Sequence, residues 1–208
     1  MCRVEVLCHS SIRIQGKSII YIDPYKIKKE IKDADYIFIT HSHYDHFSEE
    51  DIRRIIKEDT VIIVPFDLEE KALKLLEKKE KIITVLPNMH YKIDEIEFDT
   101  TYAYNINKLY HPKDNNWVGY ILKIGDESYY IAGDTDNIKE LQEIQCDIAL
   151  LPIGGTYTMD YKEAADLANS IKAKVIIPTH YGLLVGKKED AKKFASLVKE
   201  KEVKILIK

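Results

Sequence analysis

Apolar and polar positions along this chain alternate with two different periods. Short stretches of period two, rich in Val, Ile and Tyr, predict strands, whereas apolar residues at every third or fourth position predict helices. The chain opens with three strand-like stretches over residues 3–22, with a turn at Gly16 and Lys17 before the last. Asp23 ends this strand-rich stretch because a residue that precedes proline avoids the helical region.

The remaining predicted strands and helices follow in a similar order in the two halves of the chain. Predicted strands cover residues 35–40, 60–64, 81–86, 91–104 (two strands around a turn), 117–124, 128–132, 147–151, 174–178 and 203–207. Predicted helices cover residues 48–57, 67–80, 137–144, 160–171 and 188–201. Both halves of the chain are strand-rich and end in strand–helix units. The pattern therefore predicts an α/β fold with one domain over residues 1–208, a four-layer αββα sandwich of two mixed β-sheets with outer helices.

Composition narrows the class of protein. The chain has 208 residues, of which 45% are hydrophobic and 32% charged, as in globular proteins. A net charge of −4 provides no basic surface for nucleic acid, so we expect a small-molecule substrate. Three cysteines are too few for a disulfide scaffold, and neither a signal sequence nor an apolar run near 18 residues is present. We therefore expect a cytoplasmic protein with no membrane segment, and leave open whether it forms a homo-oligomer.

Ligand-type side chains are concentrated directly after the predicted buried strand at residues 35–40. His41, His43, Asp45 and His46 place three imidazoles and one carboxylate within six residues. These groups are the ligands that borderline divalent metals prefer. A polar surface loop that is rich in histidine by chance is the alternative. Four residues with ligand-type side chains among six, at the end of a buried strand, favour a metal site.

The same segment carries a family resemblance. The pattern His41-x-His43-x-Asp45-His46 resembles the H-x-H-x-D-H signature of the metallo-β-lactamase superfamily of metal-dependent hydrolases. The resemblance implies that His41 and His43 bind one metal, and that Asp45 and His46 bind a second. The cofactor expected from it is one or two divalent ions, zinc or manganese.

Two later strand ends continue the resemblance. A Gly-Asp-Thr segment contains Asp134 and resembles the family segment whose aspartate bridges two metals, and a Thr-His-Tyr segment contains His180 and resembles the one with the last metal histidine. Taken alone, Asp134 is also a good helix cap, and a lone histidine such as His180 is more often structural. Their order along the chain, together with the first motif, favours ligand roles for both.

Further segments resemble the branch of the superfamily that includes L-ascorbate 6-phosphate lactonase. They are residues 9–11, 22–24, 151–158 and 177–182. Within them, Thr156 and Tyr181 are candidates for contact with the substrate or with a metal ligand. His9 is either a hydrogen-bonded structural histidine or a residue that contacts the substrate.

One position departs from the family pattern. The family usually ends a strand with a third histidine for the first metal, whereas this chain has Asn105 there, with His111 six residues later. A neutral amide is a poorer ligand for zinc than imidazole. Either His111 fills the place, or the first metal site is weakened and His111 is an ordinary loop residue. Asn105 is itself a candidate for contact with the substrate or a ligand.

The resemblance and the ligand set together predict a metal-dependent hydrolase. A metal-bound hydroxide would attack an ester, lactone or phosphoester of a small molecule. Asp45 would orient the nucleophile, and His111 or His9 would bind the substrate or protonate the leaving group. One alternative is a phosphodiesterase or nuclease acting on RNA or DNA, because relatives with the same loop cut RNA. The other is a metal-binding, non-catalytic sensor or scaffold, for which Asn105 is the only supporting feature.

Overall fold

The computed structural model of this protein describes residues 2–76 and 78–207. The chain divides into two compact units, Met1–Leu86 and Pro87–Lys208. Each unit contains one mixed β-sheet with its own helices, so the predicted pair of mixed sheets is present. The assignment of residues 1–208 to a single domain stays a prediction. In the part of the chain described here, no helix is long and apolar enough to cross a membrane.

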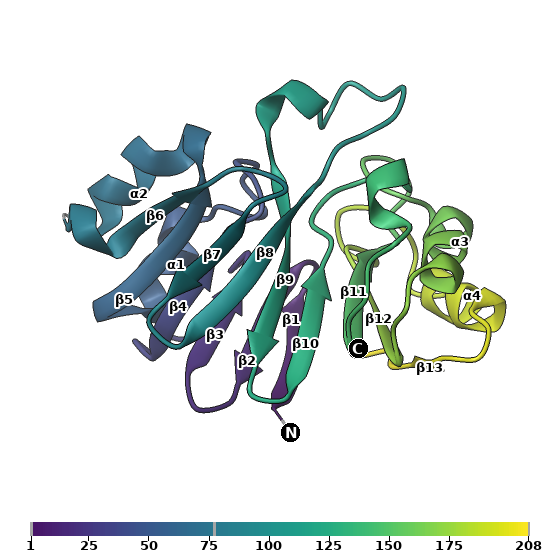
Figure 1. Cartoon of the computed structure of the whole chain (residues 1–208), viewed down its shortest axis with the longest axis horizontal. Coiled ribbons are helices and arrows are strands. Elements are labelled where there is room, and N and C mark those ends of the chain that lie inside the picture. The colour runs from purple at the N-terminus through teal and green to yellow at the C-terminus, as the bar shows by residue number, and fades with distance from the viewer. Residues whose placement is uncertain (1, 77, 208) are drawn as a thin grey trace. The chain divides into compact units, whose positions relative to one another are not determined.

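The first unit is built on a six-stranded sheet. Its order is β1-β2-β3-β4-β5-β6, with β1 to β3 antiparallel and β3 to β6 parallel. The strands are β1 Arg3–Cys8, β2 Ser11–Gln15, β3 Ile19–Ile22, β4 Ala34–Phe38, β5 Ile56–Pro65 and β6 Ile82–Val85. The helices are α1 Glu49–Ile55 and α2 Glu69–Leu76, with short 3-10 turns η1 Phe66–Leu68 and η2 Lys79–Lys81. Helix α2 lies against β5 and β6 (Figure 1).

Local chemistry explains where α1 begins. Ser48 is the N-cap, and its hydroxyl accepts a hydrogen bond from the Asp51 backbone N–H at 3.3 Å. The Asp51 carboxylate in turn accepts from the backbone N–H groups of Lys26 and Ile27, each at 2.8 Å. These bonds fix the loop after β3 against the start of α1. The helix predicted from residue 48 therefore begins at this serine cap.

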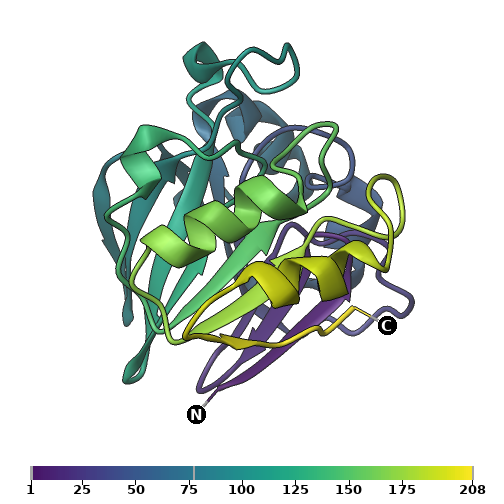
Figure 2. The ribbon, with the colours of Figure 1, turned by 90° about the vertical axis from the view of Figure 1, so that its right-hand side faces the viewer.

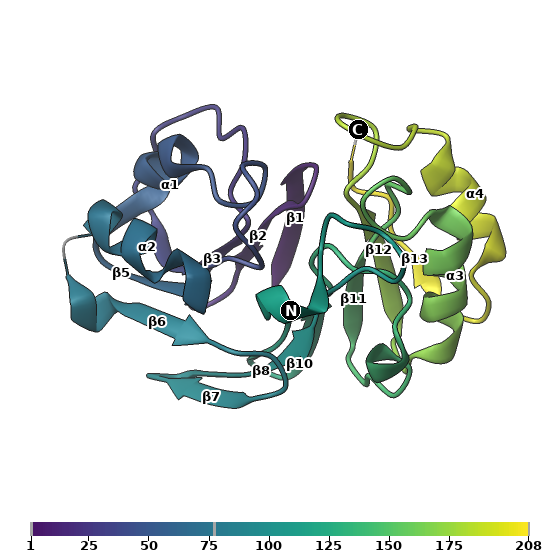
Figure 3. The ribbon, with the colours of Figure 1, turned by 90° about the horizontal axis from the view of Figure 1, so that it is seen from above.

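The second unit is built on a seven-stranded sheet of order β13-β12-β11-β10-β9-β8-β7. Its strands are β7 His90–Ile93, β8 Ile96–Tyr102, β9 Val118–Ile124, β10 Glu127–Ile131, β11 Ile148–Pro152, β12 Val175–Thr179 and β13 Glu202–Val203. Its helices are α3 Tyr161–Ser170 and α4 Asp190–Leu197, with 3-10 turns η3 Lys113–Asn115 and η4 Lys139–Leu141. Helices α3 and α4 lie side by side along one face of this sheet (Figure 2; Figure 3).

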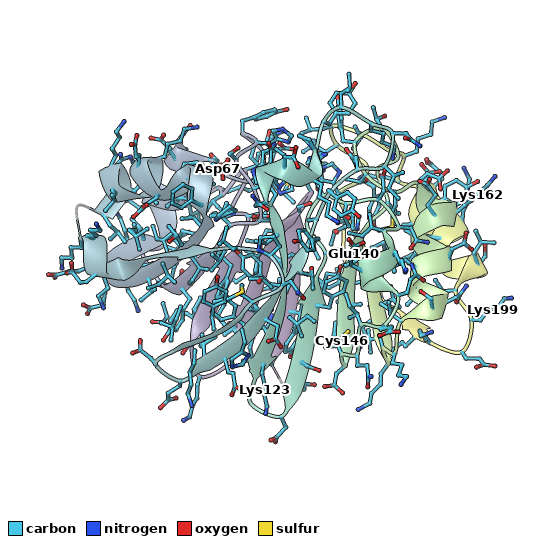
Figure 4. All side chains as sticks on the ribbon, turned by 45° about the horizontal axis from the view of Figure 1, so that its top comes forward. Asp67, Lys123, Glu140, Cys146, Lys162 and Lys199 are labelled. Atoms are coloured by element: carbon cyan, nitrogen blue, oxygen red, sulfur yellow. The ribbon has the colours of Figure 1, made fainter. Side chains whose placement is uncertain are left out.

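The start and the buried face of helix α3 both follow from its sequence. Asp160 forms a capping box with Glu163, which satisfies backbone N–H groups at the first turn. The alanine and leucine side chains of one face enter the hydrophobic cluster of this unit. Lys162 on the other face and Lys199 beyond α4 are exposed and point away from the ribbon (Figure 4). The charged residues of these predicted helices therefore form solvated faces.

Three predicted elements of the second unit are wrong in extent. The helix expected over residues 137–144 is only the three-residue turn η4, because Ile144 and Cys146 exchange backbone hydrogen bonds with Lys172 and are held extended. The final helix covers eight residues instead of fourteen, and the final strand two residues instead of five. That last strand pairs through Glu202 and Val203, at the edge of the sheet.

Candidate metal sites

Three loops of the first unit leave the same edge of its sheet. Strand β1 is antiparallel to β2, β2 is antiparallel to β3, and β3 is parallel to β4. The carboxyl ends of β1, β3 and β4 therefore meet at one edge. His9 follows β1, Asp23 follows β3, and the histidine motif at residues 41–46 follows β4. The topology explains why residues far apart in the sequence gather here.

The histidines of the motif approach one another closely. His41 Nε2 lies 3.1 Å from His43 Nδ1. Two nitrogen ligands of a tetrahedral zinc ion are separated by about 3.3 Å, given Zn–N bonds of about 2.0–2.1 Å. The His41 and His46 rings have centroids 3.9 Å apart. The spacing of the nitrogen atoms suits a shared divalent ion.

Asp23 is a buried carboxylate to which the sequence assigned no chemistry. It accepts hydrogen bonds from the backbone N–H of Thr40 at 2.8 Å and from the Thr40 hydroxyl at 2.7 Å. It also accepts from His46 Nδ1 at 2.7 Å. Burial raises the pKa of the Asp23 carboxyl, and the contacts with His46 and Thr40 oppose that rise. The sequence signal was the aspartate at the end of β3, which indicated only the end of a strand.

These bonds also fix the tautomers of two histidines. His46 Nδ1 donates to the Asp23 carboxylate, so its Nε2 is the acceptor atom. The Thr40 hydroxyl gives its hydrogen to Asp23, and its oxygen therefore accepts from His41 Nδ1 at 2.9 Å. A histidine that binds metal almost always donates its other ring N–H in this way. His41 and His46 are thus prepared to bind metal through Nε2.

Asp45 lies between two imidazoles of the first unit. Its Oδ2 is 3.3 Å from His9 Nε2 and 3.8 Å from His46 Nε2. His9 is buried, and its backbone is left-handed with φ of 55°. Few residues other than glycine adopt that conformation, and histidine is among the more tolerant. The structure thus brings two predicted catalytic residues, His9 and Asp45, into direct contact.

Four loops of the second unit also share one edge of their sheet. Strands β8 and β10 are each antiparallel to β9, and β10, β11 and β12 are parallel, so the carboxyl ends of all four meet. Asn105 follows β8, Asp134 follows β10, Gly154 follows β11 and His180 follows β12. Three of these residues were predicted to contribute to the site.

Asp134, His180 and His111 form a compact group in this unit. Asp134 Oδ2 is 3.0 Å from His180 Nε2 and 3.4 Å from His111 Nε2. All three side chains are buried. The predicted ligands Asp134 and His180 are therefore neighbours, and the same carboxylate oxygen also faces His111.

Asn105 contacts His111 through its side chain. Its Oδ1 lies 2.9 Å from His111 Nδ1, and its backbone N–H donates to the His111 carbonyl at 2.8 Å. These two contacts pin both ends of a short segment, which we call the closed loop (residues 105–111). It belongs to the connection between β8 and β9, which extends beyond the ends of both strands in Figure 1.

Gly154 makes room for His180, a role that the sequence did not reveal. A Cβ atom at Gly154 would lie 2.5 Å from the His180 carbonyl oxygen, 2.9 Å from His180 Nδ1 and 2.6 Å from Val185 Cγ2. His180 itself has a left-handed backbone with φ of 56°. A side chain at position 154 is therefore incompatible with this position of His180.

The remaining candidates lie in different surroundings. Thr156 is exposed in the loop after β11, and Tyr181 is buried in the hydrophobic cluster of the second unit. Burial raises the pKa of Tyr181 to about 12, so its phenol is neutral at physiological pH. His90, the histidine at the start of β7, is exposed and lies 2.8 Å from Asp99.

The donor set in each unit fits a divalent metal. Each set combines imidazole nitrogens with carboxylate oxygens, the chemistry that zinc and manganese accept. His41, His46 and His111 each have Nδ1 within hydrogen-bond distance of an oxygen, which leaves Nε2 as the ligand atom. The residues present therefore suit the metal that the sequence resemblance implies.

A family model supports the same interpretation. The model for the β-lactamase superfamily domain matches residues 3–180. The chain belongs to the metallo-β-lactamase superfamily. A UPF0173 metal-dependent hydrolase of Pyrococcus furiosus is 31% identical over 225 aligned residues, which cover 100% of this chain and 97% of that relative. A UPF0173 metal-dependent hydrolase of Nanoarchaeum equitans is 30% identical, over 99% of this chain and 95% of the relative.

Solved structures of other proteins share the fold. A candidate metal-dependent hydrolase from Parabacteroides distasonis superposes with a TM-score of 0.83 at 28% identity, over 100% of this chain and 94% of that chain. The metallo hydrolase Igni18 of Ignicoccus hospitalis has a TM-score of 0.77 at 24% identity, over 98% and 94% of the two chains, which shows the fold alone. The predicted metallo-β-lactamase fold and membership in a family of metal-dependent hydrolases are confirmed.

Proposed function

We propose that this member of the metallo-β-lactamase superfamily hydrolyses an ester, lactone or phosphoester of a small molecule with the help of one or two zinc or manganese ions. The proposal gives ligand roles to the residues that the family signature implies. They are His41, His43, Asp45, His46, Asp134 and His180.

One observation carries the proposal. The imidazoles of the motif are oriented by partners on their Nδ1 atoms, with Asp23 at 2.7 Å from His46 and Thr40 at 2.9 Å from His41. A buried carboxylate and a buried hydroxyl that hold two histidines in the Nε2-acceptor form serve metal binding better than they serve packing. Family membership supports the same chemistry.

The chain's own residues supply orientation and proton transfer. When bound, a divalent metal acts as a Lewis acid and lowers the pKa of the water that it coordinates. Asp45 would orient the attacking water and accept its proton on Oδ2. The 3.3 Å distance between that oxygen and His9 Nε2 supports a role for His9 in passing the proton to the leaving group.

A small molecule is the substrate class that we favour. The net charge of −4 gives no general attraction for the phosphate backbone of nucleic acids. The segments that resemble the L-ascorbate 6-phosphate lactonase branch favour a lactone or a phosphoester. The proposal therefore ranks these two classes ahead of other esters.

Metal analysis of purified variants tests the ligand assignment. We expect His41→Ala and His180→Ala each to lower the molar ratio of bound zinc or manganese, measured by elemental analysis after reconstitution. His90→Ala is the matched control, because His90 is an exposed histidine that lies beside Asp99. It should keep the wild-type ratio. A wild-type ratio in either of the first two variants would remove that residue from the ligand set.

Activity is tested on the reconstituted protein with a panel of lactones, phosphomonoesters, phosphodiesters and activated esters. We expect turnover of at least one lactone or phosphoester and its loss in both ligand variants. Full metal occupancy without turnover of any compound would overturn the proposed hydrolase and favour a sensor or scaffold. Cleavage of RNA with a strong dependence on salt would favour the nuclease instead.

A further inference from the structure

We propose that Asn105 is a positioning residue that holds His111 in the tautomer and direction required to bind metal. The proposal rests on the proposed metal-dependent function and deepens it. It assigns the amide at the family's histidine position to the support of an imidazole six residues later, instead of to the metal.

The surroundings of Asn105 settle which end of its amide is the oxygen. The Nδ2 atom lies 3.0 Å from Asp136 Oδ1 and 2.8 Å from the carbonyl oxygen of Tyr157. A carboxylate and a carbonyl only accept hydrogen bonds, so the atom that faces both must be the NH₂ group. The opposite arrangement would place three oxygen atoms against one another. Asn105 Oδ1 is therefore the atom that faces His111.

This orientation of the amide determines the tautomer of His111. An amide oxygen can only accept, so His111 Nδ1, 2.9 Å away, must carry the hydrogen. In the neutral imidazole, Nε2 then has the lone pair. That atom lies 3.4 Å from Asp134 Oδ2, which in turn is 3.0 Å from His180 Nε2. His111 thus presents a ligand atom beside two predicted ligands.

Asn105 is itself firmly held. Asp136 accepts from the backbone N–H of Ile106 at 2.8 Å and from Lys108 Nζ at 2.6 Å. The same Lys108 ammonium donates to the carbonyl of Thr158 at 2.8 Å. Lys108 and Asp136 form a half-buried ion pair that ties the closed loop to the neighbouring loops of the second unit. An amide fixed at its NH₂ end cannot rotate to release His111.

The family pattern alone would not give this arrangement. A histidine at position 105 would offer an imidazole in place of the amide, with no carbonyl oxygen to accept from His111 Nδ1. We therefore expect Asn105→His to weaken metal binding, although it restores the residue that the family usually has. Tighter binding of zinc by this variant would overturn the proposal.

A pair of substitutions separates positioning from stability. Asn105→Asp keeps an oxygen that accepts from His111, but it sets a carboxylate against Asp136 and the Tyr157 carbonyl. Asn105→Leu is similar in size. It removes both the oxygen that accepts from His111 and the NH₂ group that donates to Asp136 and Tyr157. We expect Asn105→Leu to bind cobalt or zinc about 10–100-fold more weakly, and Asn105→Asp to retain more of the affinity. We expect the melting temperatures to follow the opposite order to the metal affinities, so that Asn105→Asp melts at a lower temperature than Asn105→Leu.

Ser128→Ala is the matched control for stability. Ser128 lies at the start of β10, and its hydroxyl donates to Asp147 at 2.9 Å, at the opposite end of the strand from Asp134. It should lower the melting temperature without changing metal affinity. If Asn105→Leu behaves like this control, with wild-type metal affinity, the residue is merely structural and the proposal is overturned.

A direct measurement of the tautomer needs no metal. Nitrogen-15 spectra of histidine in the metal-free protein, at mildly alkaline pH, should show hydrogen on Nδ1 of His111 in the wild type and a loss of that preference in Asn105→Leu. Hydrogen on Nε2 in the wild type would overturn the proposal. If the wild-type protein binds no divalent metal, the proposed function fails, whereas this spectrum still decides the role of Asn105.

Discussion

A single methyl group at Gly154 should displace His180. Gly154 follows β11, and its φ is negative, so alanine is allowed there by the backbone. The new Cβ would nonetheless lie 2.5 Å from the His180 carbonyl oxygen and 2.9 Å from His180 Nδ1. Gly154→Ala therefore tests a steric effect on one predicted ligand, with Val185 Cγ2 at 2.6 Å as the other group that must move.

The size of the effect follows from these distances. The shortest contact falls about 0.9 Å below ordinary van der Waals distance, so the backbone and ring of His180 must move by a comparable amount. Forcing a methyl group into a packed site costs about 1–3 kcal/mol of stability. A ligand must stay within about 0.5 Å of its productive position. We expect metal affinity to fall by about tenfold or more, the scale seen when the support of a ligand is disturbed.

The assay is competition with a chromophoric chelator for zinc, together with melting of the metal-free protein. Gly125→Ala is the control, since Gly125 has φ of +61° and nothing within 4 Å of its Cβ position. It should lower the melting temperature through backbone strain and leave metal affinity unchanged. Wild-type metal affinity in Gly154→Ala, or an equal loss in Gly125→Ala, would refute the reasoning.

Asp45→Asn should lower turnover at least about 100-fold while melting near the wild type, because its loop gives little support to the core; a much lower melting point with normal turnover would contradict its role. Asp23→Asn should weaken zinc binding about 10–100-fold, measured by chelator competition, because His46 loses its carboxylate partner; unchanged affinity would remove Asp23 from the site. Asp147→Asn should destabilise the protein by about 1 kcal/mol at neutral pH. Lys174 and Ser128 lower the pKa of Asp147 to about 2, below its unfolded value, so its stabilisation is present above about pH 4 and lost as the pH falls toward 2. The denaturant midpoint of Asp147→Asn should therefore fall less steeply than that of the wild type as the pH is lowered. Parallel midpoint-against-pH curves for the two proteins would contradict this role of Asp147.

The strands and the first ligand motif could be predicted because their signals are local. The β-branched stretch before His41 indicated a buried strand, and β4 Ala34–Phe38 is there. The predicted helix over residues 137–144 was wrong. The backbone of Lys172, a residue distant in the sequence, hydrogen-bonds to Ile144 and Cys146, and these bonds prevent a helix from continuing there. Local periodicity carries no information about such a partner.

The supporting residues of the site escaped prediction for the same reason. Asp23 reaches Thr40 and His46 only because Ile22 pairs with Phe38 in the parallel register of β3 and β4. Register between parallel strands is set by packing across long stretches of chain. Gly154 is likewise required only because the carbonyl of His180, at the end of a neighbouring strand, lies too close to allow a side chain. A sequence shows which groups can bind metal, and the sheet decides which groups orient them.

The closed loop also has an evolutionary consequence. Both of its ends are pinned by bonds between Asn105 and His111, and Lys108 ties its middle to Asp136, so the other side chains between the two ends can vary without moving either end. Three of the five residues between the ends have large exposed apolar side chains, Ile106, Leu109 and Tyr110. Lengthening a surface loop carries only a small entropic penalty. Mutations that alter substrate choice are therefore expected to accumulate at Ile106, Leu109 and Tyr110, where side chains can change while the metal-binding residues stay in place.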